Sequence, residues 1–198
     1  MWKFFSRLTV LSALLLAAVS IAPSARAADS PTAFIQGLGN QAISVLSNPS
    51  ETPAARKQTF ARLFTQNFDV ATIGRFVLGR YWRSATPQQQ QEYLNVFQNY
   101  VVSIYNDRFS QYSGEKFVVT GGTGTLVQSQ VLRSNGGPPI NINWRLRPAA
   151  GGYKIVDVVV ENLSMSVTQR DEFASVIDRN GGRVQALIDL LKQKTAAL

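Results

Sequence analysis

The chain has 198 residues, with 20 lysines and arginines against 12 aspartates and glutamates, which gives a net charge of +8. It contains neither histidine nor cysteine, and this excludes catalytic sites of the Ser-His-Asp and Cys-His types in their usual form. The basic residues are scattered rather than gathered into a run, so the charge does not indicate a nucleic-acid-binding protein.

The first 27 residues have the pattern of a secretory signal peptide. Lys3 and Arg7 precede the apolar run Leu8–Ile21, and a small-x-small cleavage pattern ends at Ala27. The run is shorter than the roughly 20 residues needed to span a bilayer, and no stop-transfer pattern follows it. We therefore predict cleavage after Ala27 rather than an uncleaved anchor. The remaining single domain, 28–198, has 17 basic and 12 acidic residues, a net charge of +5.

Three helix starts can be predicted, because a serine or threonine stands directly before a proline at Ser30, Thr52 and Thr86. A hydroxyl residue at the N-cap followed by proline at the first helical position is a typical helix beginning. The predicted helices span 31–47, 53–66, 70–79 and 87–112. In the last of these, Tyr93, Phe97, Tyr100 and Ile104 recur at helical spacing and form one aromatic face.

After Gly114 the apolar period changes to that of strands. Four strands are predicted, at Phe117–Thr120, Thr125–Arg133, Ile140–Arg147 and Tyr153–Val160. Short glycine-rich connections require antiparallel neighbours. The third strand alternates apolar residues on one face, including Ile142 and Trp144, with polar residues on the other. Two closing helices are predicted at 164–179 and 182–195.

The predicted order of elements is helices, then a four-strand meander, then helices. This order predicts an α+β domain, with a twisted four-stranded antiparallel sheet flanked by N-terminal and C-terminal helices. The aromatic helix would cover the dry face of the sheet. Between Phe60 and Tyr112 lie twelve of the seventeen aromatic residues that remain after the signal peptide. A tight cover would make these an ordinary core, and a looser one would leave an apolar cavity. The residues alone leave both possibilities open.

The segment Ile73–Arg83, followed by Ala85-Thr86-Pro87 and the aromatic helix, resembles the signature of the MlaC family, also called the toluene-tolerance family. The segments Tyr153–Val158, Glu161–Met165 and Arg170–Phe173 resemble later family motifs in the same order. The chain departs from the family at Asn162, where a glycine is usual. Asparagine also tolerates a positive φ, so we expect this turn to be kept.

The resemblance implies a periplasmic lipid carrier without enzymatic activity, whose helices and sheet enclose an apolar cavity for phospholipid acyl chains. It implies an inner-membrane ABC transporter complex with a membrane-anchored substrate-binding subunit, and an outer-membrane lipoprotein complex, as partners. Some members of the family are associated with hopanoid pathways, so a hopanoid carrier is one alternative. A second alternative is an envelope adaptor that binds only protein. The wet-face residues Arg145 and Arg147 would form a docking patch in a carrier or in an adaptor.

A carrier of this kind needs a wide apolar wall without strong polar groups for the lipid tails. The residues predicted to form it are Phe76, Trp82, Tyr105, Phe109, Ile142, Trp144, Val159 and Met165. A phosphate headgroup at the mouth would favour arginine. Arg75, Arg80 and Arg83 form a local cluster that fits this role or, equally, a solvated helix end.

An enzymatic alternative would have to use carboxylates, and Asp157 and Glu161 are the pair to consider. Four residues apart on a strand, they would stand about 13 Å apart, beyond either glycosidase geometry. Asp157 is instead the one polar residue inside an apolar strand. We expect it to pair with an arginine or with backbone donors in a structural role.

Overall fold

The computed structural model describes residues 30–48, 50–109, 112 and 114–197. The predicted signal peptide lies outside the described residues. Among the residues that are described, no helix is both long and apolar enough to cross a bilayer.

The first two helices begin at their predicted capping residues. Helix α1 (Pro31–Leu46) starts after Ser30, whose hydroxyl accepts a hydrogen bond from the N–H of Ala33 at 3.1 Å. Helix α2 (Pro53–Asn67) starts after Thr52, which accepts from the N–H of Ala55 at 3.2 Å. Capping oxygens satisfy N–H groups that the helix itself cannot pair. The predicted starts are therefore confirmed.

Helix α3 (Val70–Leu78) is capped by Asp69 and continues into the short 3-10 helix η1 (Gly79–Trp82). The long helix α4 (Pro87–Phe109) begins after Thr86, as predicted, and its start is a capping box. There the N–H of Thr86 donates to Gln89 Oε1, and the N–H of Gln89 donates to Thr86 Oγ1. The predicted end of α4 at residue 112 is too late, because Tyr112 is not helical.

The sheet has five antiparallel strands among the described residues, in the order β1-β2-β3-β4-β5. They are β1 (Lys116–Thr123), β2 (Leu126–Leu132), β3 (Ile140–Ala149), β4 (Gly152–Val160) and β5 (Leu163–Ser164). The prediction of four strands was wrong in number, since β5 has two residues and is too short to show an alternating pattern. The turn before it has φ 66° at Asn162, which confirms the positive φ expected there.

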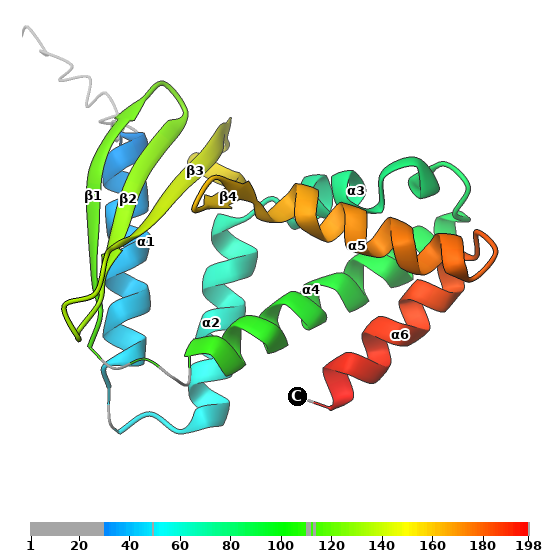
Figure 1. Cartoon of the computed structure of the whole chain (residues 1–198), viewed down its shortest axis with the longest axis horizontal. Coiled ribbons are helices and arrows are strands. Elements are labelled where there is room, and N and C mark those ends of the chain that lie inside the picture. The colour runs from blue at the N-terminus through cyan, green and yellow to red at the C-terminus, as the bar shows by residue number, and fades with distance from the viewer. Residues whose placement is uncertain (1–29, 49, 110–111, 113, 198) are drawn as a thin grey trace, which may run out of the picture.

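The chain closes with α5 (Met165–Arg179) and α6 (Val184–Ala196). Figure 1 shows α1 lying along strands β1 and β2, while α3, α4, α5 and α6 gather into a helical lobe beside the sheet. Helix α2 runs between these two parts and contacts both α1 and α4.

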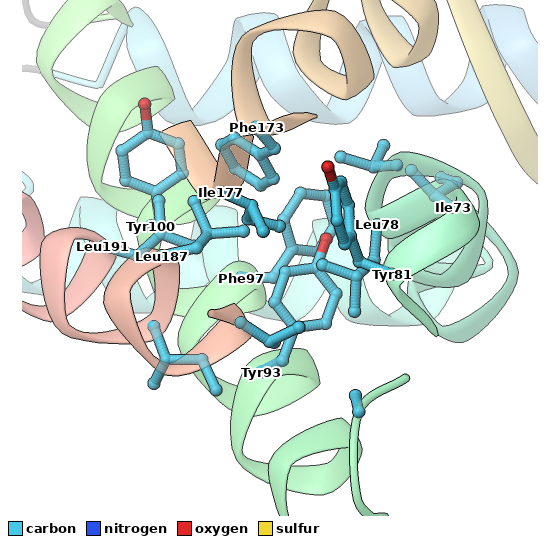
Figure 2. Packing of buried hydrophobic residues seen from close by; sticks show 14 residues of the cluster. Ile73, Leu78, Tyr81, Tyr93, Phe97, Tyr100, Phe173, Ile177, Leu187 and Leu191 are labelled. Carbon is cyan, nitrogen blue, oxygen red and sulfur yellow. The ribbon is translucent and has the colours of Figure 1, made fainter. Parts of the chain in front are cut away.

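Two hydrophobic cores follow from this arrangement. The helical core joins α3, η1, α4, α5 and α6, and Figure 2 shows the rings of Tyr93, Phe97 and Phe173 at its centre. The sheet core is smaller and contains four fully buried residues, Ile35, Val127, Leu146 and Ile155. Phe68, at the end of α2, packs against both cores. Phe68 is thus an apolar connection between the two parts of the molecule.

A polar cluster on the surface of the helical lobe gives a pH-dependent contribution to stability. The Asp178 carboxylate accepts hydrogen bonds from the Tyr81 hydroxyl and from Arg80 Nη2, the latter at 2.8 and 2.9 Å. The hydrogen bond from Tyr81, helped by the positive charge of Arg80, holds the pKa of Asp178 below its ordinary value of 3.8.

We therefore expect an Asp178→Asn variant to lose less stability in acid than the wild type. A carboxylate whose pKa is lower in the folded state favours folding above the pKa of the unfolded chain, and this contribution disappears as pH falls through the folded value. Urea denaturation between about pH 5 and about pH 2 measures the effect. Equal acid sensitivity of the variant and the wild type would contradict the role given to Asp178.

Candidate functional site

A cavity of about 530 Å³ lies between the sheet and the helices. This volume falls within the roughly 300–1,000 Å³ typical of sites that bury small molecules. Its walls come from α1 to α5 and from strands β1 to β4. The charged residues in the described lining are two acids, Glu115 and Asp157, and almost everything else there is apolar.

One wall is built by α1 and α2. On α1, Leu38, Ala42 and Leu46 recur at i, i+4 and i+8 and face the cavity. On α2, Phe60 and Phe64 stand one turn apart and face it from the other side. The apolar stripe that makes each helix amphipathic therefore faces an open space along part of its length instead of a filled core.

The opposite wall is the dry face of the sheet. Ile142 and Trp144 of β3 lie there as the alternation predicts, beside Phe117 of β1 and Val158 of β4. The rings of Phe117 and Trp144 meet edge to face, with centroids 6.2 Å apart and an interplanar angle of 77°. The indole Nε1–H of Trp144 donates to the hydroxyl of Ser129 at 2.8 Å. This wall is therefore held together by both ring packing and a hydrogen bond.

Gly39 allows α1 to approach this wall closely. A Cβ built on Gly39 would stand 2.2 Å from Cδ1 of the Phe117 ring, a distance that non-bonded carbon atoms cannot adopt. Gly37, on the same helix, has no atom within 4 Å of an added Cβ. The two glycines thus provide a matched comparison of crowding against open space.

We predict that Gly39→Ala destabilises the protein by about 1–3 kcal/mol, because the methyl group overpacks against Phe117. Gly37→Ala should instead stabilise it by about 0.5–1 kcal/mol, since alanine loses less conformational freedom in a helix. Urea denaturation of both variants measures the difference in the free energy of unfolding. Equal effects at the two positions would show that the ring of Phe117 moves aside at little cost.

The cavity lies between the two hydrophobic cores, beside Phe68, which packs against both. Ile73, Val77 and Phe97 contribute one side of their side chains to the helical core and another to the cavity lining. Ile35 does the same from the sheet core. The cavity is therefore flanked on two sides by apolar side chains that are packed into the two cores.

Asp157 is the buried acid of the site, with 7% of its surface exposed. Its carboxylate accepts hydrogen bonds from the Ser164 hydroxyl at 2.7 Å, the N–H of Ser166 at 3.2 Å and the Arg145 guanidinium at 3.3 Å. The expectation that it pairs with an arginine or with backbone donors is confirmed. The same carboxylate ties β3 and β4 to the first turn of α5.

Glu161, the other carboxylate considered, accepts from the N–H of Asn141 at the exposed end of the sheet and does not line the cavity. Within the described part of the chain, no group of three or more acidic, histidine or cysteine side chains is placed to hold a metal ion.

Four of the eight residues predicted to form the wall line the cavity, and they come from α4, β3 and α5. These residues are Tyr105, Ile142, Trp144 and Met165. The side chain of Phe109 lies outside the described part of the structure.

The other three predicted wall residues lie elsewhere. Trp82 packs against the helical core. Phe76 is 44% exposed, with the Arg170 guanidinium 5.0 Å from its ring centroid. Val159 lies opposite Asn143 of β3, while its neighbours Val158 and Val160 line the cavity.

A β-bulge explains the placement of Val159. Arg145 pairs with Asp157 and Leu146 with Ile155, so Val156 has no partner between them. An extra residue on one strand reverses the alternation of faces beyond it. Ile155 therefore faces the sheet core while Val158, not Val159, shares its face. The alternation in the sequence carries no sign of this bulge.

The three arginines predicted for a headgroup do not line the cavity in the described structure. Arg80 binds Asp178 at 2.8 Å, and the Arg75 guanidinium lies 5.8 Å from the centroid of the Trp82 ring. Arg83 is exposed near the end of η1. Their placement favours the alternative of a solvated helix end.

The wet-face arginines are also engaged by acids. Arg145 pairs with Asp157, and Arg147 pairs with Asp69 at the start of α3. The arginine side chains stay 58% and 48% exposed, while the side chains of the two acids are 8% and 10% exposed. The guanidinium groups therefore face the solvent while their partners anchor them to the fold.

The cavity residues of α1 and α2 were missed by the sequence analysis, although both helices were predicted. The available signal was the apolar stripe of α1, with Leu38, Ala42 and Leu46 on one side. Such a stripe does not distinguish a helix that faces a filled core from one that faces a cavity.

Comparison with known protein sequences adds three findings. Residues 36–193 match the model of a family described as MlaC protein. The chain is 24% identical over 173 residues to the toluene tolerance protein ttg2D of Pseudomonas putida, covering 82% of this chain and 80% of that protein. It is also 22% identical to the intermembrane phospholipid transport system binding protein MlaC of Haemophilus influenzae. That alignment of 208 residues covers 98% of this chain and 94% of the relative.

A solved structure shares the fold. The phospholipid-binding protein from Ralstonia solanacearum, solved in complex with a phospholipid, matches with a TM-score of 0.73 at 22% sequence identity. The match covers 85% of this chain and 98% of that one.

Proposed function

The chain belongs to the MlaC family, as its motifs predicted, and we propose that it is a soluble periplasmic carrier that holds phospholipid acyl chains in the cavity between its sheet and helices. The observation that carries the proposal is the cavity itself, about 530 Å³ in volume and walled almost entirely by apolar side chains. The relatives named for phospholipid transport and phospholipid binding support the same class of ligand.

The energetics of lipid transfer fit such a cavity. Two acyl chains of roughly 15 methylenes each would cost on the order of 24 kcal/mol if left in water, at about 0.8 kcal/mol per methylene. An apolar cavity removes most of this cost, and so does a bilayer. Because both environments are apolar, the free energy of transfer between them stays small. The carrier can then both accept a lipid and release it.

We further propose that residues 1–27 direct export and are removed, leaving a single domain over 28–198. In the periplasm the carrier would receive lipid from, or deliver it to, an inner-membrane ABC transporter complex through a membrane-anchored subunit, and exchange it with an outer-membrane lipoprotein complex. These partners rest on membership of the family. No catalytic step is part of the proposal, since the buried carboxylate Asp157 is engaged in tying β3, β4 and α5 together.

Native mass spectrometry of the protein, purified from the periplasm without detergent, tests this function. A bound mass of phospholipid size, identified after organic extraction, is the expected result. A hopanoid mass would keep the carrier mechanism and change the cargo. Protein that holds no lipid and takes none up from phospholipid vesicles would overturn the proposal and favour a protein-binding adaptor.

A further inference from the structure

We propose that Trp144, held in place by Ser129, forms the floor of the cavity and sets the longest acyl chain that the protein accepts. The inference rests on the proposed function and adds a chain-length limit to it. It follows from where the cavity ends on each strand and from how the indole ring is fixed.

The cavity ends at one level across the sheet. Val127, Trp144 and Val158 lie opposite one another on β2, β3 and β4 and form a row. The apolar lining residues of these three strands all lie in this row or on one side of it, at Val131, Ile140, Ile142, Trp144, Val158 and Val160. The lining residue just beyond the row is Asp157, whose carboxylate is bound by Ser164 and Ser166 at the start of α5. Beyond the row, Leu146 and Ile155 do not line the cavity.

The region beyond the row is filled. Val127 and Ile155 have no exposed surface, and Leu146 is 5% exposed. These side chains form the sheet core together with Ile35 of α1. A close-packed core does not admit another methylene without strain. The end of the cavity is therefore a solid boundary, and Trp144 is its largest side chain.

Ser129 determines how the indole ring lies on this boundary. Ser129 is 2% exposed, and its hydroxyl accepts the Nε1–H of Trp144 at 2.8 Å while lying 3.4 Å from the carbonyl of Ile142. Without this acceptor the indole N–H would face an apolar space, which is unfavourable for a polar group. The Phe117 ring packs in an edge-to-face arrangement with the same indole. Ser129 is thus a positioning residue for Trp144.

The consequence is a limit on chain length. An acyl chain that reaches the floor meets a ring fixed by a hydrogen bond on one side and by Phe117 on the other. A longer chain has to displace that ring or leave methylenes outside the cavity. Trp144→Leu removes most of the ring while keeping an apolar surface, so it deepens the cavity. Ser129→Ala leaves the ring in place but frees its orientation.

The first experiment measures which chains are bound. Wild type, Trp144→Leu, Ser129→Ala and Ser129→Thr are incubated with vesicles that contain one headgroup and an equimolar series of chain lengths, and the bound lipids are identified by mass spectrometry. For Trp144→Leu we expect the ratio of longest to shortest bound chains to rise by about threefold or more. This increase is smaller than the about tenfold change in discrimination that one methylene can produce in a rigid pocket, because the headgroup end of the lipid can shift.

Ser129→Ala should broaden the distribution of chain lengths, and Ser129→Thr, which retains a hydroxyl, should restore it. A purely structural role for Ser129 would lower the melting temperature of the alanine variant while leaving the distribution unchanged, and this result would overturn its role. An unchanged distribution of chain lengths in Trp144→Leu would overturn the proposal that Trp144 forms the floor of the cavity. Wild-type protein that binds no lipid would instead overturn the proposed function.

A second experiment locates the chain end. The domain after the predicted signal peptide has two tryptophans, Trp82 and Trp144, so Trp82→Phe leaves Trp144 as the single reporter. Phospholipid brominated near the terminal methyl group should quench its fluorescence more strongly than phospholipid brominated near the ester. The reverse order would place the headgroup end at Trp144 and contradict the inference.

Discussion

An Ala42→Trp variant should fold normally and retain about tenfold to one hundredfold less lipid than the wild type. Ala42 lies on the cavity side of α1, between Leu38 and Leu46. An indole at this position enters the space that acyl chains would occupy. Excluding two to four methylenes, at about 0.8 kcal/mol each, corresponds to roughly this loss of affinity. The helix itself tolerates tryptophan at a small cost in propensity.

Ala54→Trp is the matched control, because Ala54 is exposed on the first turn of α2 and does not line the cavity. Lipid retention is measured by extraction and mass spectrometry after purification without detergent, and folding by circular dichroism and thermal melting. We expect the control to retain lipid like the wild type. Full lipid occupancy in Ala42→Trp would show that the acyl chains lie somewhere other than between α1 and the sheet.

Local chemistry explains which parts of the fold could be predicted. The helix beginnings at Ser30, Thr52 and Thr86 depend on residues within one turn, and all three were found. The alternation in β3 placed Ile142 and Trp144 correctly on the dry face, since period-two patterning is also local. The pairing of Asp157 was expected because an acid inside an apolar strand needs donors nearby.

Features that depend on partners distant in sequence were not predictable. The bulge at Val156 exists only in relation to β3, and it moves the cavity face from Val159 to Val158. The placement of Phe76 on helix α3 also depends on residues distant in sequence. Its neighbour Val77 is buried, but Phe76 is partly exposed and its ring lies under the Arg170 guanidinium of α5. Being aromatic does not determine which face of α3 a residue occupies.

The cavity is the most non-local feature of all. It requires that the helical core and the sheet core each close on themselves while remaining connected through Phe68. The sequence shows surplus aromatic residues, and in α4 they are divided between the core and the cavity. Phe97 packs in the helical core and also lines the cavity, and Tyr105 lines the cavity. Tyr93 and Tyr100 are buried in the helical core. The same surplus therefore fits either a filled core or a cavity, and only the three-dimensional packing separates them.

Tyr93→Ala should lower the stability of the protein by about 3–5 kcal/mol, the usual cost of removing a buried aromatic ring. The Tyr93 side chain has no exposed surface and lies with its ring centroid 5.7 Å from that of Phe97 and 6.4 Å from that of Phe173. Burial raises the pKa of its hydroxyl above the ordinary range, so the group stays neutral and donates to the carbonyl of Gly74 at 3.1 Å. The expected fall in melting temperature is on the order of 10 °C.

Tyr93→Phe distinguishes the contribution of the ring to stability from that of the hydroxyl. It keeps both ring contacts and leaves the Gly74 carbonyl without this donor, so we expect a loss of about 1 kcal/mol. Neither Tyr93 nor Gly74 lines the cavity, and the phenylalanine variant should therefore retain as much lipid as the wild type when both are fully folded. Thermal melting gives the stability of each variant, and lipid extraction gives its occupancy. A phenylalanine variant that is stable but empty of lipid would show that the Tyr93 hydroxyl controls lipid binding through the helical core, although neither Tyr93 nor Gly74 lines the cavity.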